Sequence, residues 1–174
     1  RGIAERSYEN VFFREFSKNL AEMFEKYSIE GLLIGNSECE LLPTLQIDAL
    51  LITNNAICII DFKNYEGEIN LPSTSNFSEI QWTTKGNIIV RGGNSINPYV
   101  QLYKQKGRFG VVFNKYVKNE LPENCKADPS HVHKIVCFQK PIKLNGKVPI
   151  ADELSFFITD SEKYLDTIKD IIDV

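Results

Sequence analysis

The clearest absence in this sequence is a long stretch without any acidic residue. No Asp or Glu occurs from residue 80 to residue 119, although the 174-residue chain holds 23 acidic residues. This stretch carries seven basic residues: Lys85, Arg91, Lys104, Lys106, Arg108, Lys115 and Lys118. It therefore has a charge of +7, which leaves −10 for the remainder of a chain whose net charge is −3. A cationic surface of this kind would attract phosphate, unless the side chains point in different directions and form no patch.

Other features are also missing. No apolar run approaches the length of a membrane span, and the acid-containing N-terminal segment does not resemble a signal peptide, so we expect no membrane partner. The four cysteines lie apart without C-x-x-C spacing, which favours reduced thiols and a cytoplasmic location. The chain lacks a Walker phosphate loop, so any ATPase activity would lie outside it. Because it does not begin with Met, we expect it to be a piece of a longer protein.

The apolar content, 43% of residues, is enough for one α/β domain that spans residues 1–174. Hydrophobic periodicity and turn residues predict its elements. Helices are expected over residues 4–27, 97–116 and 160–172, the last capped by Asp160 or Ser161. Strands are expected over residues 29–34, 46–53, 56–63, 67–71 (a continuation of 56–63), 80–84, 87–91, 132–139 and 156–159.

Two neighbouring apolar strands are each interrupted by a carboxylate, Asp48 in the first and Asp61 in the second. The Asn54-Asn55 pair between them suits a two-residue hairpin turn, because Asn tolerates the positive φ that such turns require. Counting back from this turn places Asp48 directly opposite Asp61. Their Cβ atoms would then lie roughly 5 Å apart, where like charges repel.

Lys63 would share a face with Asp61, because side chains alternate along a strand. Two acids in an apolar strand pair are costly unless a cation or proton neutralises them, and oxygen ligands favour Mg²⁺ or Mn²⁺. The pattern therefore predicts a metal-dependent site that cuts phosphodiesters. The alternative is a buried salt bridge between Asp61 and Lys63 beside a half-exposed Asp48.

The N-terminal segment predicts an amphipathic helix. Its apolar stripe consists of Phe13, Phe16, Leu20, Met23 or Phe24, and Tyr27. Steps of four residues back from Phe13 reach Glu9 and then Glu5, so both acids extend the stripe. Glu9 is the stronger functional candidate, whereas Glu5 could be a solvated acid of the first turn.

A further helix begins at Asn97, which can cap it, with Pro98 at its first position. Its polar side consists of Gln101, Lys104, Gln105 and Arg108. Such a face is often only solvated. Within the acid-free stretch, however, it predicts a nucleic-acid-binding surface that includes Lys85, Arg91, Lys104 and Arg108.

Four motifs occur in order: Ile-Asp-Ala-Leu-Leu-Ile around Asp48, the segment Asp61-Phe62-Lys63-Asn64-Tyr65-Glu66-Gly67-Glu68-Ile69, the lone Trp82, and Asn97-Pro98-Tyr99-Val100-Gln101-Leu102. Over about residues 5–113 these motifs resemble the nuclease-related domain (NERD) family of the PD-(D/E)xK phosphodiesterase superfamily. The resemblance implies an α/β restriction-endonuclease-like core with a central mixed β-sheet flanked by helices. It also implies that longer members can carry a helicase or other ATPase domain downstream.

The resemblance also assigns roles to individual positions. The family's helical acid corresponds to Glu9, its strand aspartate to Asp48, the acid and lysine of E-x-K to Asp61 and Lys63, and the helix glutamine to Gln101. The chain departs from the family twice. Asp61 stands where Glu is commoner. Tyr8 stands where Gly often precedes the helical acid, which leaves Glu5 open as an alternative to Glu9.

In such a site Asp48, Asp61, Glu9 and the backbone carbonyl of Phe62 would hold one or two Mg²⁺ ions, and Mn²⁺ could substitute. The metal would lower the pKa of a water and offset transition-state charge. Lys63 would orient that water or stabilise charge. Gln101 would position the site or a phosphate oxygen.

The expected function is hydrolysis of DNA phosphodiester bonds in DNA processing, repair or defence, with a helicase or ATPase domain attached elsewhere in the longer chain. One alternative is an inactive nucleic-acid-binding or protein-docking module, in which Lys63 only pairs with Asp61. Another is a small-molecule phosphodiesterase, which would keep the metal site and have no need of the basic stretch.

Overall fold

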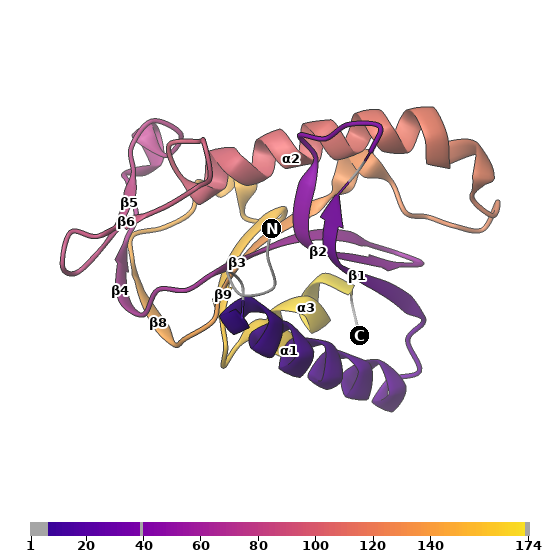
Figure 1. Ribbon diagram of the computed structural model, residues 1–174, viewed down its shortest axis with the longest axis horizontal. Helices are drawn as coiled ribbons and strands as arrows, with labels where there is room; N and C mark the ends of the chain where they lie inside the picture. The colour runs from indigo at the N-terminus through magenta and orange to yellow at the C-terminus, as the bar shows by residue number, and fades with distance from the viewer. Residues whose placement is uncertain (1–6, 39, 173–174) are drawn as a thin grey trace.

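The computed structural model describes residues 7–38 and 40–172 (Figure 1). Within them, a five-stranded mixed sheet forms the centre of the molecule. Strands β1, β2 and β3 are antiparallel, whereas β3, β7 and β9 are parallel. In spatial order the strands are β1 (Gly31–Glu38), β2 (Gln46–Thr53), β3 (Ile57–Lys63), β7 (His133–Phe138) and β9 (Phe156–Asp160). This is the mixed α/β architecture that the sequence predicts.

A smaller sheet extends beyond the end of β3 (Figure 1). Its strands, in spatial order, are β6 (Ile89–Val90), β5 (Trp82–Thr84), β4 (Gly67–Asn70) and β8 (Ile142–Asn145). The predicted hairpin is confirmed as β5–β6, in which Trp82 pairs with Val90. One expectation is wrong, because β4 belongs to this second sheet and does not continue β3. Strand β8 was not predicted.

Helices cover both faces of the large sheet (Figure 1). Helices α1 (Ser7–Lys26) and α3 (Tyr164–Ile172) lie on one face, and α2 (Pro98–Val112) lies on the other. Helix α2 continues into a π-helical turn, η3 (Phe113–Val117). The described residues also form short 3₁₀ helices: η2 (Thr74–Asn76), η4 (Lys118–Glu120), η5 (Pro129–His131) and η6 (Ile150–Asp152).

The alternation of side chains along β3 decides which helix each residue faces. Cys58 and Ile60 pack in the cluster that contains α1 and α3, whereas Ile57 and Ile59 pack in the cluster that contains α2. Asp61 continues the second series, so its side chain lies on the α2 side of the sheet.

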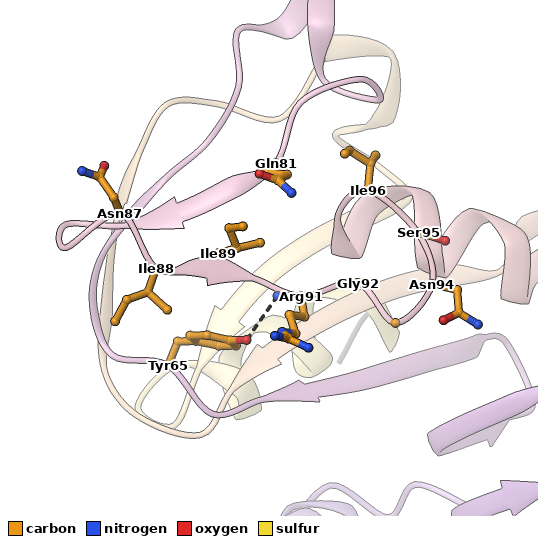
Figure 2. A pocket seen from close by; sticks show the side chains of 11 residues that line it. Tyr65, Gln81, Asn87, Ile88, Ile89, Arg91, Gly92, Asn94, Ser95 and Ile96 are labelled. Atoms are coloured by element: carbon orange, nitrogen blue, oxygen red, sulfur yellow. Dashed lines mark hydrogen bonds between the residues drawn. The ribbon is translucent and has the colours of Figure 1, made fainter.

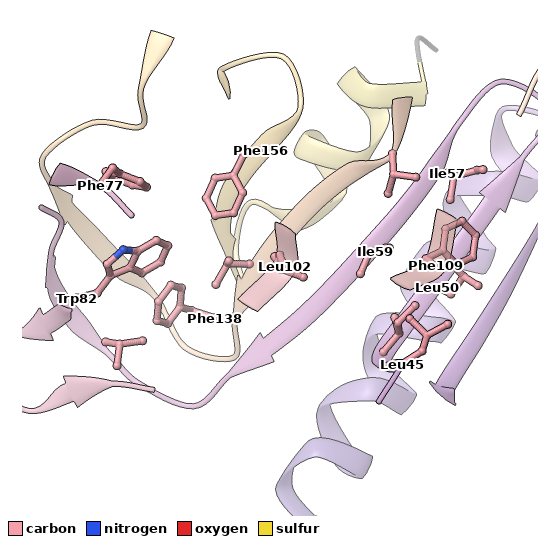
Figure 3. Packing of buried hydrophobic residues seen from close by; sticks show 14 of the residues in the cluster. Leu45, Leu50, Ile57, Ile59, Phe77, Trp82, Leu102, Phe109, Phe138 and Phe156 are labelled. Carbon is pink, nitrogen blue, oxygen red and sulfur yellow. The ribbon is translucent and has the colours of Figure 1, made fainter. Parts of the chain in front are cut away.

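Aromatic packing fixes the start of α2 against the small sheet. Trp82 is fully buried and makes ring contacts with Phe77 and Phe156 at centroid distances of 5.9 and 6.3 Å (Figure 3). Tyr99, in the first turn of α2, contacts the same two rings at 5.0 and 5.1 Å. The polar side of α2 is therefore held in a defined orientation above the sheet.

Asn97 caps α2 as predicted. Its side-chain oxygen accepts a hydrogen bond from the Val100 N–H at 2.9 Å. Its amide nitrogen also donates to the carbonyls of Phe77 and Ile80, at 2.8 and 2.9 Å. This buried side chain thus joins the helix to the connection between β4 and β5.

Some helix boundaries differ from the prediction. Helix α1 is described from Ser7, so Ala4 and Glu5 lie outside the described residues. Tyr27 does not belong to the buried stripe: it follows the helix, is 37% exposed, and accepts a hydrogen bond from Lys169. Helix α3 begins at Tyr164, because Asp160 ends β9 and accepts hydrogen bonds from the N–H groups of the turn that follows.

The β2–β3 register is confirmed, but the predicted reason for the turn is wrong. Among described residues other than glycine, positive φ occurs at Ser28 and Asn87, not at Asn54 or Asn55. Thr53 holds the turn instead, because its hydroxyl accepts from the N–H groups of Asn55 and Ala56 at 3.3 and 3.1 Å.

Within the described part of the chain, no helix has both the length and the apolar character that a membrane crossing requires.

Candidate functional site

The site begins where the β2–β3 ladder ends. Its last backbone pair is Ala49 with Ile60, and one further step of the register brings Asp48 opposite Asp61. There the Asp48 carboxylate accepts a hydrogen bond from the Phe62 N–H at 3.0 Å. Asp48 thus takes a backbone donor of β3, and both acids line the same cavity.

Lys63 connects Asp61 of β3 to Gln101 of helix α2. Its ammonium nitrogen is 2.8 Å from Asp61 Oδ2 and donates to Gln101 Oε1 at 3.0 Å. The Lys63 and Asp61 side chains are only 11% and 12% exposed. Asp61 Oδ2 is buried and, among the described residues, has this ion-pair partner but no well-oriented hydrogen bond.

Gln101 is held by the capped first turn of α2, where its N–H donates to the Asn97 carbonyl at 3.1 Å. Gly93 approaches this side chain closely, since a Cβ built there would lie 3.3 Å from Gln101 Nε2. Gly93 also has a φ of +62°, which glycine adopts readily. The segment before α2 is therefore shaped to lie against the site.

The cavity at these residues has a volume of about 400 Å³. Its walls come from residues 92–95, from the polar side of α2, and from Pro43, Thr44, Gln46, Asp48 and Asp61. Gln105 and Arg108 attach α2 to the chain that leads into β2, because both donate to the Thr44 carbonyl, at 3.3 and 3.1 Å. These contacts fix the distance between α2 and Asp48.

The four basic residues predicted to bind nucleic acid lie at three places around the site. Lys104 and Arg108 line the site cavity, and Arg91 lines a neighbouring cavity. Lys85 lies in the β5–β6 turn, outside both cavities. Lys106, another basic residue of α2, lies near the buried ammonium of Lys134.

Glu9 lies in α1, on the opposite face of the large sheet from the Lys63–Gln101 contact. Its side chain, like all of Glu5, lies outside the described part of the structure. Among the side chains that are described, no group of three or more His, Cys, Asp or Glu residues could hold a metal ion. Among the described side chains, the carboxylates that line the site cavity are therefore those of Asp48 and Asp61.

A comparison against known families gives a match that covers all of the residues that line the site cavity. The model of the nuclease-related domain matches residues 8–139, which is most of the chain. The chain belongs to the nuclease-related domain (NERD) family. Searches of curated proteins and of solved structures gave no significant match.

The NERD match contains both acids, Lys63, Gln101 and both cavities, whereas β8, β9 and α3 lie beyond it. Sequence reasoning missed residues 92–95 of this NERD domain, which line both cavities. The available signal was Gly92-Gly93 between a strand and a helix cap, a pair typical of a tight turn.

Proposed function

We propose that this NERD domain is a Mg²⁺-dependent nuclease that hydrolyses DNA phosphodiester bonds. The observation that carries the proposal is a cavity lined by Asp48, Asp61 and Gln101, with Lys63 paired to Asp61 and held by Gln101. Carboxylates provide ligands for a hard cation, and an ammonium provides a donor for a phosphate oxygen. These are the groups that phosphodiester hydrolysis requires.

The donor set fits Mg²⁺. This ion is commonly held by one or two protein carboxylates together with substrate phosphates, which matches Asp48 and Asp61. The Phe62 N–H points towards Asp48, and in an extended strand the carbonyl of the same residue points to the same side, so the Phe62 carbonyl is a further ligand candidate. Glu9 comes from α1 on the other face of the sheet, so it would add a ligand through a bridging water. Bound Mg²⁺ or Mn²⁺ would lower the pKa of a water and offset the charge of the transition state.

Lys63 would act directly on the substrate. Its ammonium has three N–H donors, so it could donate to a phosphate oxygen while it still contacts Asp61 and Gln101. A fixed donor in a nearly buried site stabilises developing negative charge more strongly than a mobile one in water. Gln101 would be a positioning residue, because it acts through Lys63.

Lys104 and Arg108 would bind the DNA phosphates nearest the site, and Arg91 would bind one farther along; Lys85 would contact the backbone beyond them. The family membership supports a nuclease-related function. The proposal further places this activity in DNA processing, repair or defence, with a helicase or ATPase domain elsewhere in a longer chain. One observation favours a second candidate, a non-catalytic DNA-binding module: Asp61 and Lys63 already neutralise one another in a 2.8 Å ion pair.

The decisive experiment is Mg²⁺ and Mn²⁺ calorimetry on the native chain, Asp48→Ala and Lys63→Ala, followed by cleavage of labelled single- and double-stranded DNA. We expect Asp48→Ala to lose metal binding, and both variants to lose at least about 100-fold in cleavage rate. The exposed Asp170→Ala and Lys147→Ala are matched controls and should behave like the native chain.

The two candidates give different results. Metal binding and cleavage that both depend on Asp48 would establish the nuclease. DNA binding by a native chain that binds neither metal at millimolar concentration would establish the non-catalytic module.

A further inference from the structure

A second cavity lies next to the site, with a volume of about 640 Å³ (Figure 2). Tyr65, the β5–β6 hairpin and residues 91–96 form its walls. Residues 92–95 line both this cavity and the one that contains Asp48 and Asp61. The two cavities are therefore neighbours across a single short segment, and a ligand in one would lie beside a ligand in the other.

The second cavity is lined both by apolar side chains and by side chains that can form hydrogen bonds. Ile88, Ile89 and Ile96 are 61%, 41% and 40% exposed, which is unusual for large apolar side chains gathered at one hollow. Amide side chains from Gln81, Asn87 and Asn94 stand around them (Figure 2). This combination suits a ligand with flat apolar faces and polar edges.

Tyr65 is held in place at this cavity. Its hydroxyl accepts a hydrogen bond from the Arg91 N–H at 3.2 Å, the contact drawn in Figure 2. The ring is thus fixed beside the hollow, with the Arg91 side chain next to it. The residues that line the cavity include the cation of Arg91 and no Asp or Glu, so the site suits an anionic ligand.

We infer that the second cavity holds an unpaired base of the DNA strand whose neighbouring phosphate lies at the Asp48–Asp61 site. This inference rests on the proposed function and specifies its substrate: single-stranded DNA, or the unpaired end of a duplex. Proteins bind unpaired bases by stacking them on aromatic rings and by hydrogen bonds to their edges, while a cation binds the backbone. Intact duplex DNA presents sugar and phosphate on its outside and would leave the isoleucines uncovered.

The test is DNA binding in EDTA, measured by fluorescence anisotropy with a labelled 12-nucleotide strand and with the same strand in a blunt duplex. Because no metal is present, cleavage plays no part in the result. We expect the single strand to bind the native chain at least about 5-fold more tightly than the duplex. Tyr65→Ala should weaken single-strand binding by about 5- to 100-fold, the range that stacking of one base supplies, whereas Tyr65→Phe should keep it within about 3-fold.

Ile88→Asp gives an independent test at an exposed position, where the substitution does not disturb the core. The new carboxylate should repel the strand and weaken its binding about 10-fold, with little effect on the duplex. Ile150→Asp, at a residue that is 84% exposed and does not line the cavity, is the matched control and should change the affinity for neither DNA.

Equal affinity for the strand and the duplex, unaffected by Tyr65→Ala and Ile88→Asp, would overturn the inference, as would a native chain that binds no single strand. Either result would leave metal binding by Asp48 and Asp61 intact, so the inference and the proposed function can fail separately.

Discussion

At the scale of single residues, Lys134 is the most unusual member of the described core. Its side chain is completely buried, its ammonium donates to the Val132 carbonyl at 3.2 Å, and it lies 4.5 Å from the centre of the Tyr103 ring. Burial, and to a smaller extent the charge of Lys106, lowers the pKa of Lys134 from 10.5 to about 8, while Asp152 opposes the decrease. The folded protein therefore loses stability whenever this amine is charged.

We expect Lys134→Met to raise the free energy of unfolding by about 1–3 kcal/mol at pH 7, because Met fills the same space without a charge. The gain should shrink as the pH rises from about 8 to 10.5. Over that range the unfolded chain still binds the Lys134 proton and the folded chain does not, so the native protein gains stability that the variant cannot gain. Urea unfolding of both proteins from pH 7 to pH 10.5 measures the difference.

The native chain must be compared with Lys134→Met, because other groups in the native chain lower its stability as the pH rises. Burial raises the pKa of Cys58 to about 12 and also raises that of Cys137, so both thiols make the native protein less stable as the pH passes their unfolded values near 9. These effects cancel between native and variant proteins. Lys143→Met, at an exposed position, is the control. If the difference in free energy of unfolding between Lys134→Met and the native chain did not change with pH, the Lys134 charge would not be destabilising.

At the scale of elements, the segment between β6 and α2 couples the fold to the site. A Cβ on Gly92 would clash with the Asn97 carbonyl oxygen, a backbone atom that cannot move without shifting the start of α2. The same segment lines both cavities. Its conformation therefore decides where Gln101 lies relative to Lys63.

We expect Gly92→Ala to destabilise the protein by about 1–3 kcal/mol, as over-packing does, and to lower DNA cleavage by displacing α2. Gly86→Ala is the matched control, since no atom lies within 4 Å of a Cβ at that position, and should remain within about 0.5 kcal/mol of the native chain. Urea unfolding and cleavage rates of the two variants test this. Equal stability of the two variants would mean that the segment can move to accept a side chain.

The elements that sequence predicts well are those fixed by local pattern. Strand β2 was predicted with its observed ends, and β3 within one residue, because alternating apolar side chains and a short turn define both. Their register placed Asp48 opposite Asp61, and strand alternation put Lys63 on the same face. Helical periodicity likewise brought Gln101 to the polar side of α2, where it contacts Lys63.

What the sequence could not predict depends on distant partners. Strand β8 is short and mostly exposed, and it pairs with β4, which lies about 75 residues earlier in the chain. The position of residues 92–95 depends on the two carbonyls that the buried Asn97 amide holds. The direction of Arg108 depends on the Thr44 carbonyl. None of these contacts leaves a periodic signal in its own segment.

At the scale of the whole molecule, charge is segregated along the chain, and part of the positive charge also gathers at the two cavities. The acid-free stretch from residue 80 to residue 119 supplies Lys104 and Arg108 to the site cavity and Arg91 to its neighbour. Other basic residues of the stretch point elsewhere, as Lys106 does. DNA affinity should therefore depend on particular residues of α2 and not on the total charge of the stretch.

We expect Lys104→Ala and Arg108→Ala each to weaken DNA binding by about 3- to 10-fold, and to lower the slope of log affinity against log salt concentration by about one. Lys106→Ala removes the same charge from the same helix outside both cavities, so it should leave affinity and slope unchanged. Anisotropy titrations in EDTA from 50 to about 200 mM salt measure both quantities. Equal losses in all three variants would show instead that the stretch attracts DNA as a diffuse positive field, because only a field is indifferent to the direction in which each side chain points.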